Sequence, residues 1–210
     1  MIIKNVETKE KLNEYYHFFT KVFYEDAVKH NEHYYPMFNA YTKIAEQYEK
    51  DPTLLLYIEE NGEIVATLAA KDSTNDSITL EALTVLETCR GKGYATLLVN
   101  EMENRLAKKG ITNISLGARI RACKVYMKNK YSPTLLVQVN DFATIDLVKK
   151  ANKYNYKIVN EYQNEVCGAV FFEVDSVNEE VVDYFEKNVP TAHANYIFTK
   201  KLIRTKEKNK

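Results

Sequence analysis

Cysteine is scarce in this sequence, which bears on metal binding and on disulfides. The chain of 210 residues contains three cysteines, Cys89, Cys123 and Cys167. Their number is odd, they are far apart, and none has the spacing of metal ligands. They predict reduced thiols rather than a disulfide scaffold or a zinc site. We therefore expect no metal cofactor.

Excess charge and long apolar runs are also lacking. Lysine plus arginine and aspartate plus glutamate each total 29, and the pI is near 6.9, so no global field would draw the protein to nucleic acid or to a membrane. The first residues, MIIKNVETKE, have no apolar core of signal-peptide length, and no later run approaches the roughly 18 apolar residues of a membrane span. We expect a cytoplasmic protein that binds neither nucleic acid nor membrane.

Apolar periodicity in the first half predicts a mixed α/β (α+β) chain. A short strand at 2–6 precedes a helix at 9–26, and a second helix runs from 37 to about 51. Asn61-Gly62 then separates two apolar, β-prone runs and predicts a tight hairpin, because both positions tolerate positive φ. A further strand at 77–85 follows. The order is strand, two helices, then three strands.

The second half continues with alternating elements. A helix after Gly93 closes at Lys109-Gly110, and a strand at 111–118, a helical run between 121 and 130 and a strand after Pro133 follow. This strand–helix–strand crossover surrounds a glycine-rich turn.

The segment 134–203 has the βαββαβ order of a ferredoxin-like module, with its first helix predicted at 142–154, although its first and last strands could equally complete the preceding sheet. We predict a core at 1–133, this C-terminal segment at 134–203, and a solvated basic tail at 204–210. An edge strand in the segment is compatible with a homodimer.

The stretch TVLETCRGKGYATLLVNEME (84–103) places a glycine-rich turn between a predicted strand and a predicted helix. Main-chain N–H groups at a helix start lack intrahelical partners, and the helix dipole favours negative charge there. Gly91 and Gly93 would let the main chain approach a pyrophosphate, and Arg90 and Lys92 could add charge-assisted contacts. The pattern favours a diphosphate site, but an isolated R-G-x-G is also found in ordinary loops.

Two familiar phosphate loops do not fit this turn. A P-loop requires G-x-x-x-x-G-K-[ST], which residues 91–96 do not supply. A dinucleotide fingerprint requires a third glycine where Thr96 stands, and an acid after the next strand, where Gly117-Ala118-Arg119 follows instead. The preceding antiparallel meander also argues against a doubly wound parallel sheet.

The turn resembles the GNAT superfamily of acyl-CoA-dependent N-acyltransferases. Its signature, [RQ]-x-x-G-x-[GA], is matched by Arg90, Gly93 and Ala95, directly after the strand LEALTV. A second family pattern, A-x-x-[FY]-Y-x-x-x-G-[FY], is matched at Ala122, Tyr126 and Tyr131. This sequence departs from the family pattern at Val125, where an aromatic residue is usual, and at Lys130, where glycine is usual. The resemblance covers roughly residues 1–135 and implies a mixed central sheet flanked by helices.

The resemblance implies acetyl-CoA as co-substrate, with its pyrophosphate on the glycine turn. The turn would contribute Arg90, Gly91, Lys92, Gly93, Tyr94, Ala95 and Thr96. Leu83 and Val85 would give main-chain contacts to the pantetheine. An amine attacks the thioester directly, so the protein must keep the amine neutral, polarise the carbonyl and protonate the departing thiolate.

Tyr126 is the candidate general acid toward the CoA sulfur, since the helical tyrosine of the family has this role and a phenol can donate a proton. The alternative is a core aromatic residue. Glu81, on the strand before the turn, is the candidate general base, directly or through water. Its alternative is a solvent-facing strand residue.

Other residues are weaker candidates. His30 and His33 fall in a loop that the family arrangement places beside the acceptor, but loop histidines are more often surface groups, and His193 has no better support. Cys123 lacks a sequence-evident base for acyl-enzyme chemistry. An aromatic acceptor wall would comprise Tyr34, Tyr35, Met37, Phe38 and Tyr41.

These observations predict an N-acetyltransferase that acts on a primary amine of a small molecule or peptide. One rival is a catalytically silent CoA-binding sensor or interaction module of the same fold. Another is a nucleotide-dependent oxidoreductase, suggested by G-x-G and Arg119. Preference for NADPH over CoA would favour the oxidoreductase.

Overall fold

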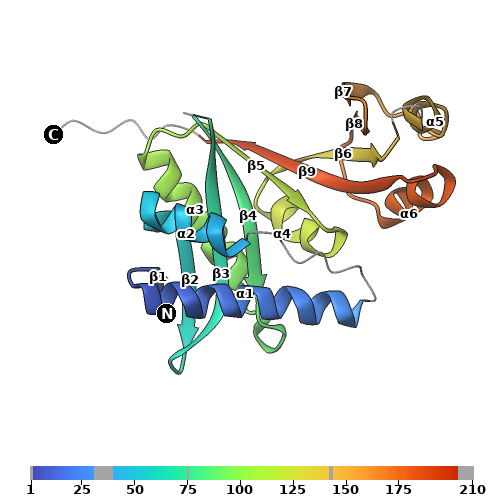
Figure 1. Cartoon of the computed structure of the whole chain (residues 1–210). Helices are drawn as coiled ribbons and strands as arrows, with labels where there is room; N and C mark the ends of the chain where they lie inside the picture. The colour runs from blue at the N-terminus through green and yellow to red at the C-terminus, as the bar shows by residue number, and fades with distance from the viewer. Residues whose placement is uncertain (1, 31–39, 75, 142–143, 203–210) are drawn as a thin grey trace. The chain divides into compact units, whose positions relative to one another are not determined.

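Four antiparallel strands with helices on both faces form the first part of the chain (Figure 1). This computed structural model describes residues 2–30, 40–74, 76–141 and 144–202. Internal packing divides the chain into a first unit, 1–114 with 201–210, and a second unit, 115–200. The elements up to the division are β1 (Ile3–Asn5), α1 (Lys9–Lys29), α2 (Ala40–Lys50), η1 (Pro52–Leu54), β2 (Leu55–Glu60), β3 (Glu63–Thr74), β4 (Ser77–Val85), η2 (Glu87–Cys89), α3 (Tyr94–Lys108) and β5 (Asn113–Ala118), which spans it.

Helix α1 begins where a capping residue precedes an apolar stripe. The Thr8 hydroxyl accepts a hydrogen bond from the Lys11 N–H at 3.2 Å, as an N-cap does. Leu12, Tyr15 and Phe19 recur at helical spacing and are buried. The helix starts at the predicted residue and continues one turn beyond the predicted end, to Lys29. The predicted start of α2 lies outside the described residues.

The strands of the first unit pair antiparallel in the order β1-β2-β3-β4. Asn61 and Gly62 have φ of 52° and 84°, so they form the tight turn predicted between β2 and β3. Between β3 and β4 the register shifts: Ala69 pairs with Ala82, and the next residue of β3 pairs with Leu80. Glu81 is therefore the extra residue of a β-bulge.

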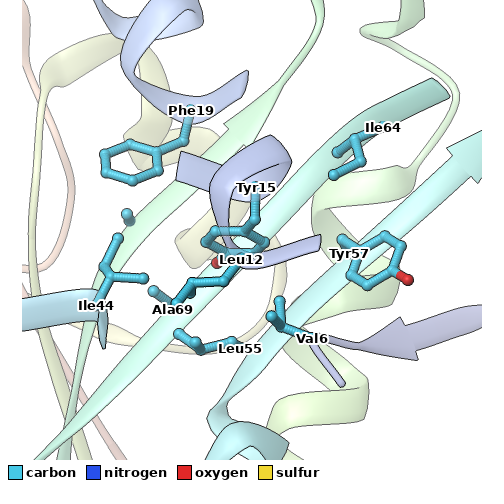
Figure 2. Packing of buried hydrophobic residues seen from close by; sticks show 10 residues of the cluster. Val6, Leu12, Tyr15, Phe19, Ile44, Leu55, Tyr57, Ile64 and Ala69 are labelled. Carbon is cyan, nitrogen blue, oxygen red and sulfur yellow. The ribbon is translucent and has the colours of Figure 1, made fainter. Parts of the chain in front are cut away.

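Both faces of this sheet are covered. On one face Leu55 and Tyr57 pack with Val6 and with the buried side chains of α1, and Figure 2 shows Leu12 and Tyr15 between that helix and the strands. On the other face lies α3, whose apolar stripe is fully buried: Leu98, Val99, Met102 and Leu106. The four residues from Leu55 to Ile58 are all buried, as expected of a strand between two helical layers.

The second unit continues with η3 (Ile120–Ala122), α4 (Cys123–Lys128), β6 (Ser132–Val139), α5 (Ile145–Lys150), β7 (Ile158–Gln163), β8 (Gly168–Glu173), α6 (Glu179–Asn188) and β9 (His193–Lys201). From β6 onward the order is βαββαβ, and the strands lie antiparallel in the order β9-β6-β8-β7. In segment numbering this is 4-1-3-2, the arrangement of a ferredoxin-like module. Its core includes the stacked rings of Phe172 and Phe185, 5.6 Å apart.

Helix α5 is shorter than its sequence pattern predicts. Periodicity favoured a helix through Tyr154, but the helix ends at Lys150. The Asn152 side chain accepts from the Tyr156 N–H at 3.1 Å and donates to the Tyr156 carbonyl at 2.8 Å. These bonds close a turn that competes with the helix, a familiar property of asparagine.

The mixed α+β fold class predicted from the sequence is confirmed, including the βαββαβ order of the C-terminal segment. The predicted domain boundary at residue 133 stays a prediction. In the part of the chain that the structure describes, no helix is both long enough and apolar enough to cross a bilayer.

Candidate functional site

The glycine-rich turn lies between β4 and α3, as predicted. Gly91 and Gly93 have φ of 81° and 87°, in the left-handed region that glycine adopts without strain. Gly93 is the N-cap of α3, and within the described residues no side chain caps this helix. The first main-chain N–H groups of a helix that runs for 15 residues are thus available to an anion, and the helix dipole favours one there.

The strand before the turn is fixed by main-chain bonds. Val85 pairs with Ala66 on β3, and the Leu86 N–H donates to the Val65 carbonyl at 2.9 Å. The Cys89 N–H then donates to the Leu86 carbonyl at 2.8 Å, which closes η2, and the Cys89 side chain is buried beneath it. The turn therefore starts from a rigid strand end.

Arg90 is tied to the end of α1. Its Nη2 donates to Asp26 Oδ1 at 2.7 Å, and its Nε donates to the Val85 carbonyl at 3.2 Å. Lys29, on the last turn of α1, also pairs with Glu87 of η2. Two ion pairs thus join the C-terminal end of α1 to η2 and to the first residue of the turn.

Lys92 and Tyr94 are held by Glu60, the last residue of β2. The Tyr94 hydroxyl donates to Glu60 Oε1, and Lys92 Nζ lies 3.2 Å from Oε2. The hydrogen bond from Tyr94 and the nearby Lys92 ammonium lower the pKa of the Glu60 carboxyl, so it is charged at neutral pH. The hydrogen bond to Glu60 likewise raises the pKa of Lys92.

Three further candidates lie on β4. Leu83 pairs with Leu68 on β3, and Val85 ends the strand directly before the turn. Glu81 is exposed at the bulge, with Lys71 Nζ 3.9 Å from its Oε1. The structure therefore brings Leu83, Val85 and the turn residues together on one strand–turn–helix unit, with Glu81 four residues before the strand end.

Tyr126 lies on α4, in the second unit. Its side chain is 5% exposed, and its ring lies 5.7 Å from that of Tyr131 and 5.5 Å from that of Phe198. Burial raises the pKa of the Tyr126 hydroxyl, with a smaller contribution from Cys123. The phenol therefore keeps its proton at neutral pH, which both a proton donor and a core tyrosine would do.

Cys123 is a buried thiol. Its Sγ lies 3.4 Å from the Arg119 carbonyl, and burial raises its pKa to about 12. A protonated thiol is a poor nucleophile, which weighs against acyl-cysteine chemistry.

Those histidine and aromatic candidates that the structure describes lie on different elements. His30 is an exposed residue at the end of α1, and His193 Nδ1 lies 3.0 Å from Glu186 Oε1 on α6. The Tyr41 hydroxyl donates to Asn13 at 2.9 Å, and its ring packs against Tyr16. The remaining candidates lie outside the described residues: His33, Tyr34, Tyr35, Met37 and Phe38. Across the described ranges, no group of three or more His, Cys, Asp or Glu side chains is placed to hold a metal.

Glu60 and Asp26 were missed by the sequence reasoning. Each contacts a basic residue of the turn, but they are 32 and 64 positions away from Lys92 and Arg90. The Asn61-Gly62 turn located Glu60 at a strand end. Only the tertiary fold shows that it faces the glycine turn.

Comparisons with known proteins bear on the family and on the fold. Residues 12–131 match the model of the acetyltransferase (GNAT) family. A sequence search of curated proteins finds no match. Among solved structures, the NatB acetyltransferase complex bound to a bisubstrate inhibitor has a TM-score of 0.56 at 18% identity, covering 99% of this chain and 94% of that chain.

Two other solved structures are similar. The ribosomal-protein-S18-alanine N-acetyltransferase of Escherichia coli has a TM-score of 0.51 at 13% identity, covering 100% of this chain and 98% of that chain. An aminoglycoside 6'-N-acetyltransferase complexed with coenzyme A has a TM-score of 0.50 at 16% identity, covering 99% of this chain and 100% of that chain. At these identities the likeness shows the fold alone.

Proposed function

The chain belongs to the GNAT acetyltransferase family, and from this premise we propose that it is an N-acetyltransferase that transfers an acetyl group from acetyl-CoA to a primary amine. The observation that carries the proposal is the uncapped start of α3, preceded by two glycines with positive φ. Such a turn suits a diphosphate, which acetyl-CoA contains. The similar aminoglycoside acetyltransferase was solved with coenzyme A, which supports the same co-substrate here.

In the proposed site, the turn from Arg90 to Thr96 binds the pyrophosphate through main-chain N–H groups, and Leu83 and Val85 offer main-chain contacts to the pantetheine. Leu83 and Val85 are paired with Leu68 and Ala66 of β3, so these contacts would come from the other edge of β4. Arg90 and Lys92 add positive charge at the edge of the turn, although each already has a carboxylate partner.

The proposed reaction is direct attack. The neutral amine nitrogen forms a bond to the thioester carbon, the C–S bond breaks, and the thiolate of CoA takes a proton from Tyr126. The amine loses its proton to Glu81, directly or through water. The protonated phenol of Tyr126 can donate and the exposed Glu81 can accept, and proton exchange with solvent returns both groups to their starting states. The raised pKa of the Cys123 thiol argues against an acyl-cysteine intermediate.

Calorimetric titration with acetyl-CoA tests the proposal. We expect saturable binding by the wild type and none by Gly93→Asp, because the added carboxylate repels the diphosphate and strains a residue with φ of 87°. Gly110→Asp is the matched control, since Gly110 has φ of 80° and lies past the opposite end of α3. Failure of the wild type to bind would refute the proposal.

Turnover separates an enzyme from a silent CoA-binding module. We expect acetylation of at least one member of a broad panel of amines, peptide N-termini included. Tight binding without turnover, unchanged by Tyr126→Phe, would contradict the proposed activity and indicate a sensor or interaction module instead.

A further inference from the structure

Glu60 contacts the glycine turn at two points. Its Oε1 accepts the Tyr94 hydroxyl at the first residue of α3, and its Oε2 lies 3.2 Å from Lys92 Nζ, between the two glycines. The buried thiol of Cys89 lies 3.8 Å from the same Oε2. The Glu60 carboxylate therefore contacts three side chains. They belong to Cys89 before the turn, Lys92 within it and Tyr94 at the start of α3.

The two glycines of the turn contribute no side-chain packing that would fix its shape. A Cβ built on Gly91 or Gly93 would meet no described atom within 4 Å. Glycine also loses more conformational freedom on ordering than any other residue. Main-chain N–H groups that must converge on an anion therefore require an external anchor, and an anchor that acts before the ligand arrives reduces the entropy lost on binding.

Strand β2, which carries Glu60, is fixed by pairing and by burial. It pairs with β1 on one side and β3 on the other, and Leu55 to Ile58 are buried. Glu60 is the last residue of this strand, past a register shift at Ile58–Glu59, and it pairs with Glu63 of β3 across the Asn61-Gly62 turn. Its carboxylate is thus carried by the end of the β2–β3 hairpin.

We propose that Glu60 is a positioning residue for acyl-CoA: it holds Lys92 and Tyr94 so that the main-chain N–H groups of the turn are ordered for the pyrophosphate. This inference rests on the proposed function. It also gives Tyr94 a role that needs no contact with the ligand, since its hydroxyl is engaged by Glu60.

A purely electrostatic account predicts the opposite result. A carboxylate beside an anion site repels the ligand and neutralises Lys92, so removal of its charge would tighten CoA binding. Positioning predicts that removal weakens binding. The sign of the change in affinity therefore decides between the two accounts.

The test is CoA titration of Glu60→Ala and Tyr94→Phe, with Glu60→Gln as the conservative variant. We expect the Kd for CoA to rise about tenfold in the first two variants, the factor that corresponds to one lost hydrogen bond to a charged group. Tyr94→Phe changes no charge and preserves the ring, so it keeps the test valid if Glu60→Ala folds poorly. Glu60→Gln keeps an acceptor for Tyr94 and should bind with intermediate affinity.

Glu59→Ala is the matched control. Glu59 is the preceding residue and pairs with Lys4 and Lys11, away from the turn. It should bind CoA within about twofold of the wild type, as expected for an ion pair outside the site. In turnover assays Glu60→Ala and Tyr94→Phe should raise KM for acetyl-CoA and leave kcat unchanged, which general destabilisation would not do.

Unchanged or tighter CoA binding by both Glu60→Ala and Tyr94→Phe, with a wild type that binds, would overturn the positioning role alone. A wild type that does not bind CoA would overturn both this role and the proposed function.

Discussion

Tyr131 and Tyr126 are joined through the main chain and through their rings. The Tyr131 N–H donates to the Tyr126 carbonyl at 3.1 Å, the Lys130 N–H donates to the Met127 carbonyl at 3.0 Å, and the two tyrosine rings lie 5.7 Å apart. This is a Schellman motif with its hydrophobic contact, and Lys130 is its left-handed residue, with φ of 63°. The second sequence pattern thus describes a helix end, and its usual glycine falls where φ is positive.

Lys130→Gly should stabilise the protein. A non-glycine residue in the left-handed region destabilises the folded state by about 1–2 kcal/mol. Glycine removes this strain, but it also gives the unfolded chain more conformational freedom, which offsets part of the gain. We expect the free energy of unfolding to rise by about 0.5–1 kcal/mol, measured by urea denaturation. Lys128→Gly, at the last residue of α4, should lower it, because glycine is a poor helix residue. A loss of stability in Lys130→Gly would contradict the assigned strain.

Tyr126→Phe should lower kcat about 10²–10⁴-fold if the phenol is the general acid, with little change in KM for acetyl-CoA. Because burial raises the pKa of Tyr126, its proton should stay in place as the pH passes about 10, the ordinary tyrosine pKa. The wild-type kcat should therefore show no decline there from loss of this proton. Tyr131→Phe is the control and should retain kcat. Equal kcat in the Tyr126 variant and the wild type would assign Tyr126 to the core instead.

Cys123 should be dispensable and unreactive. Cys123→Ala should keep kcat within a few-fold, and iodoacetamide should not label Cys123 in the folded protein at pH 8, measured by peptide mass spectrometry. A burst of product with an acylated Cys123 would contradict direct transfer.

The thiol also predicts a pH dependence of stability. Folding raises the pKa of Cys123 from 9.0 to about 12, so the folded state binds more protons between these values. The free energy of unfolding should therefore fall as the pH rises from about 9 to about 12. The fall should be smaller in Cys123→Ala, compared by urea denaturation at several pH values.

Phe185→Ala should destabilise the second unit strongly. Phe185 is fully buried and stacked on Phe172. Removal of a buried phenylalanine side chain costs about 3–5 kcal/mol, and thermal unfolding would detect the loss. Leu147→Ala is the control, because Leu147 is 41% exposed and its truncation should cost under about 1 kcal/mol. Similar losses in both variants would contradict the described packing.

The sequence predicted those features that depend on local chemistry. Asn61-Gly62 predicted a hairpin because both residues tolerate positive φ, and the apolar periodicity after Gly93 predicted α3. Helix α5 was predicted too long, because a side chain that bonds four residues ahead does not disturb the apolar periodicity. The contacts of Glu60 with Lys92 and of Asp26 with Arg90 could not be predicted, because no residue near either carboxylate in the sequence indicates its distant partner.

Strands β6 and β9 are direct neighbours, and Gln138 near the end of β6 pairs with His193 at the start of β9. Everything between them, from α5 to α6, therefore leaves and returns at adjacent points of the sheet. A two-residue turn could close the same hairpin. The intervening segment therefore has the geometry of an insertion into a β-hairpin: its loss would remove β7 and β8 from the sheet and leave the pairing of β6 with β9 in place.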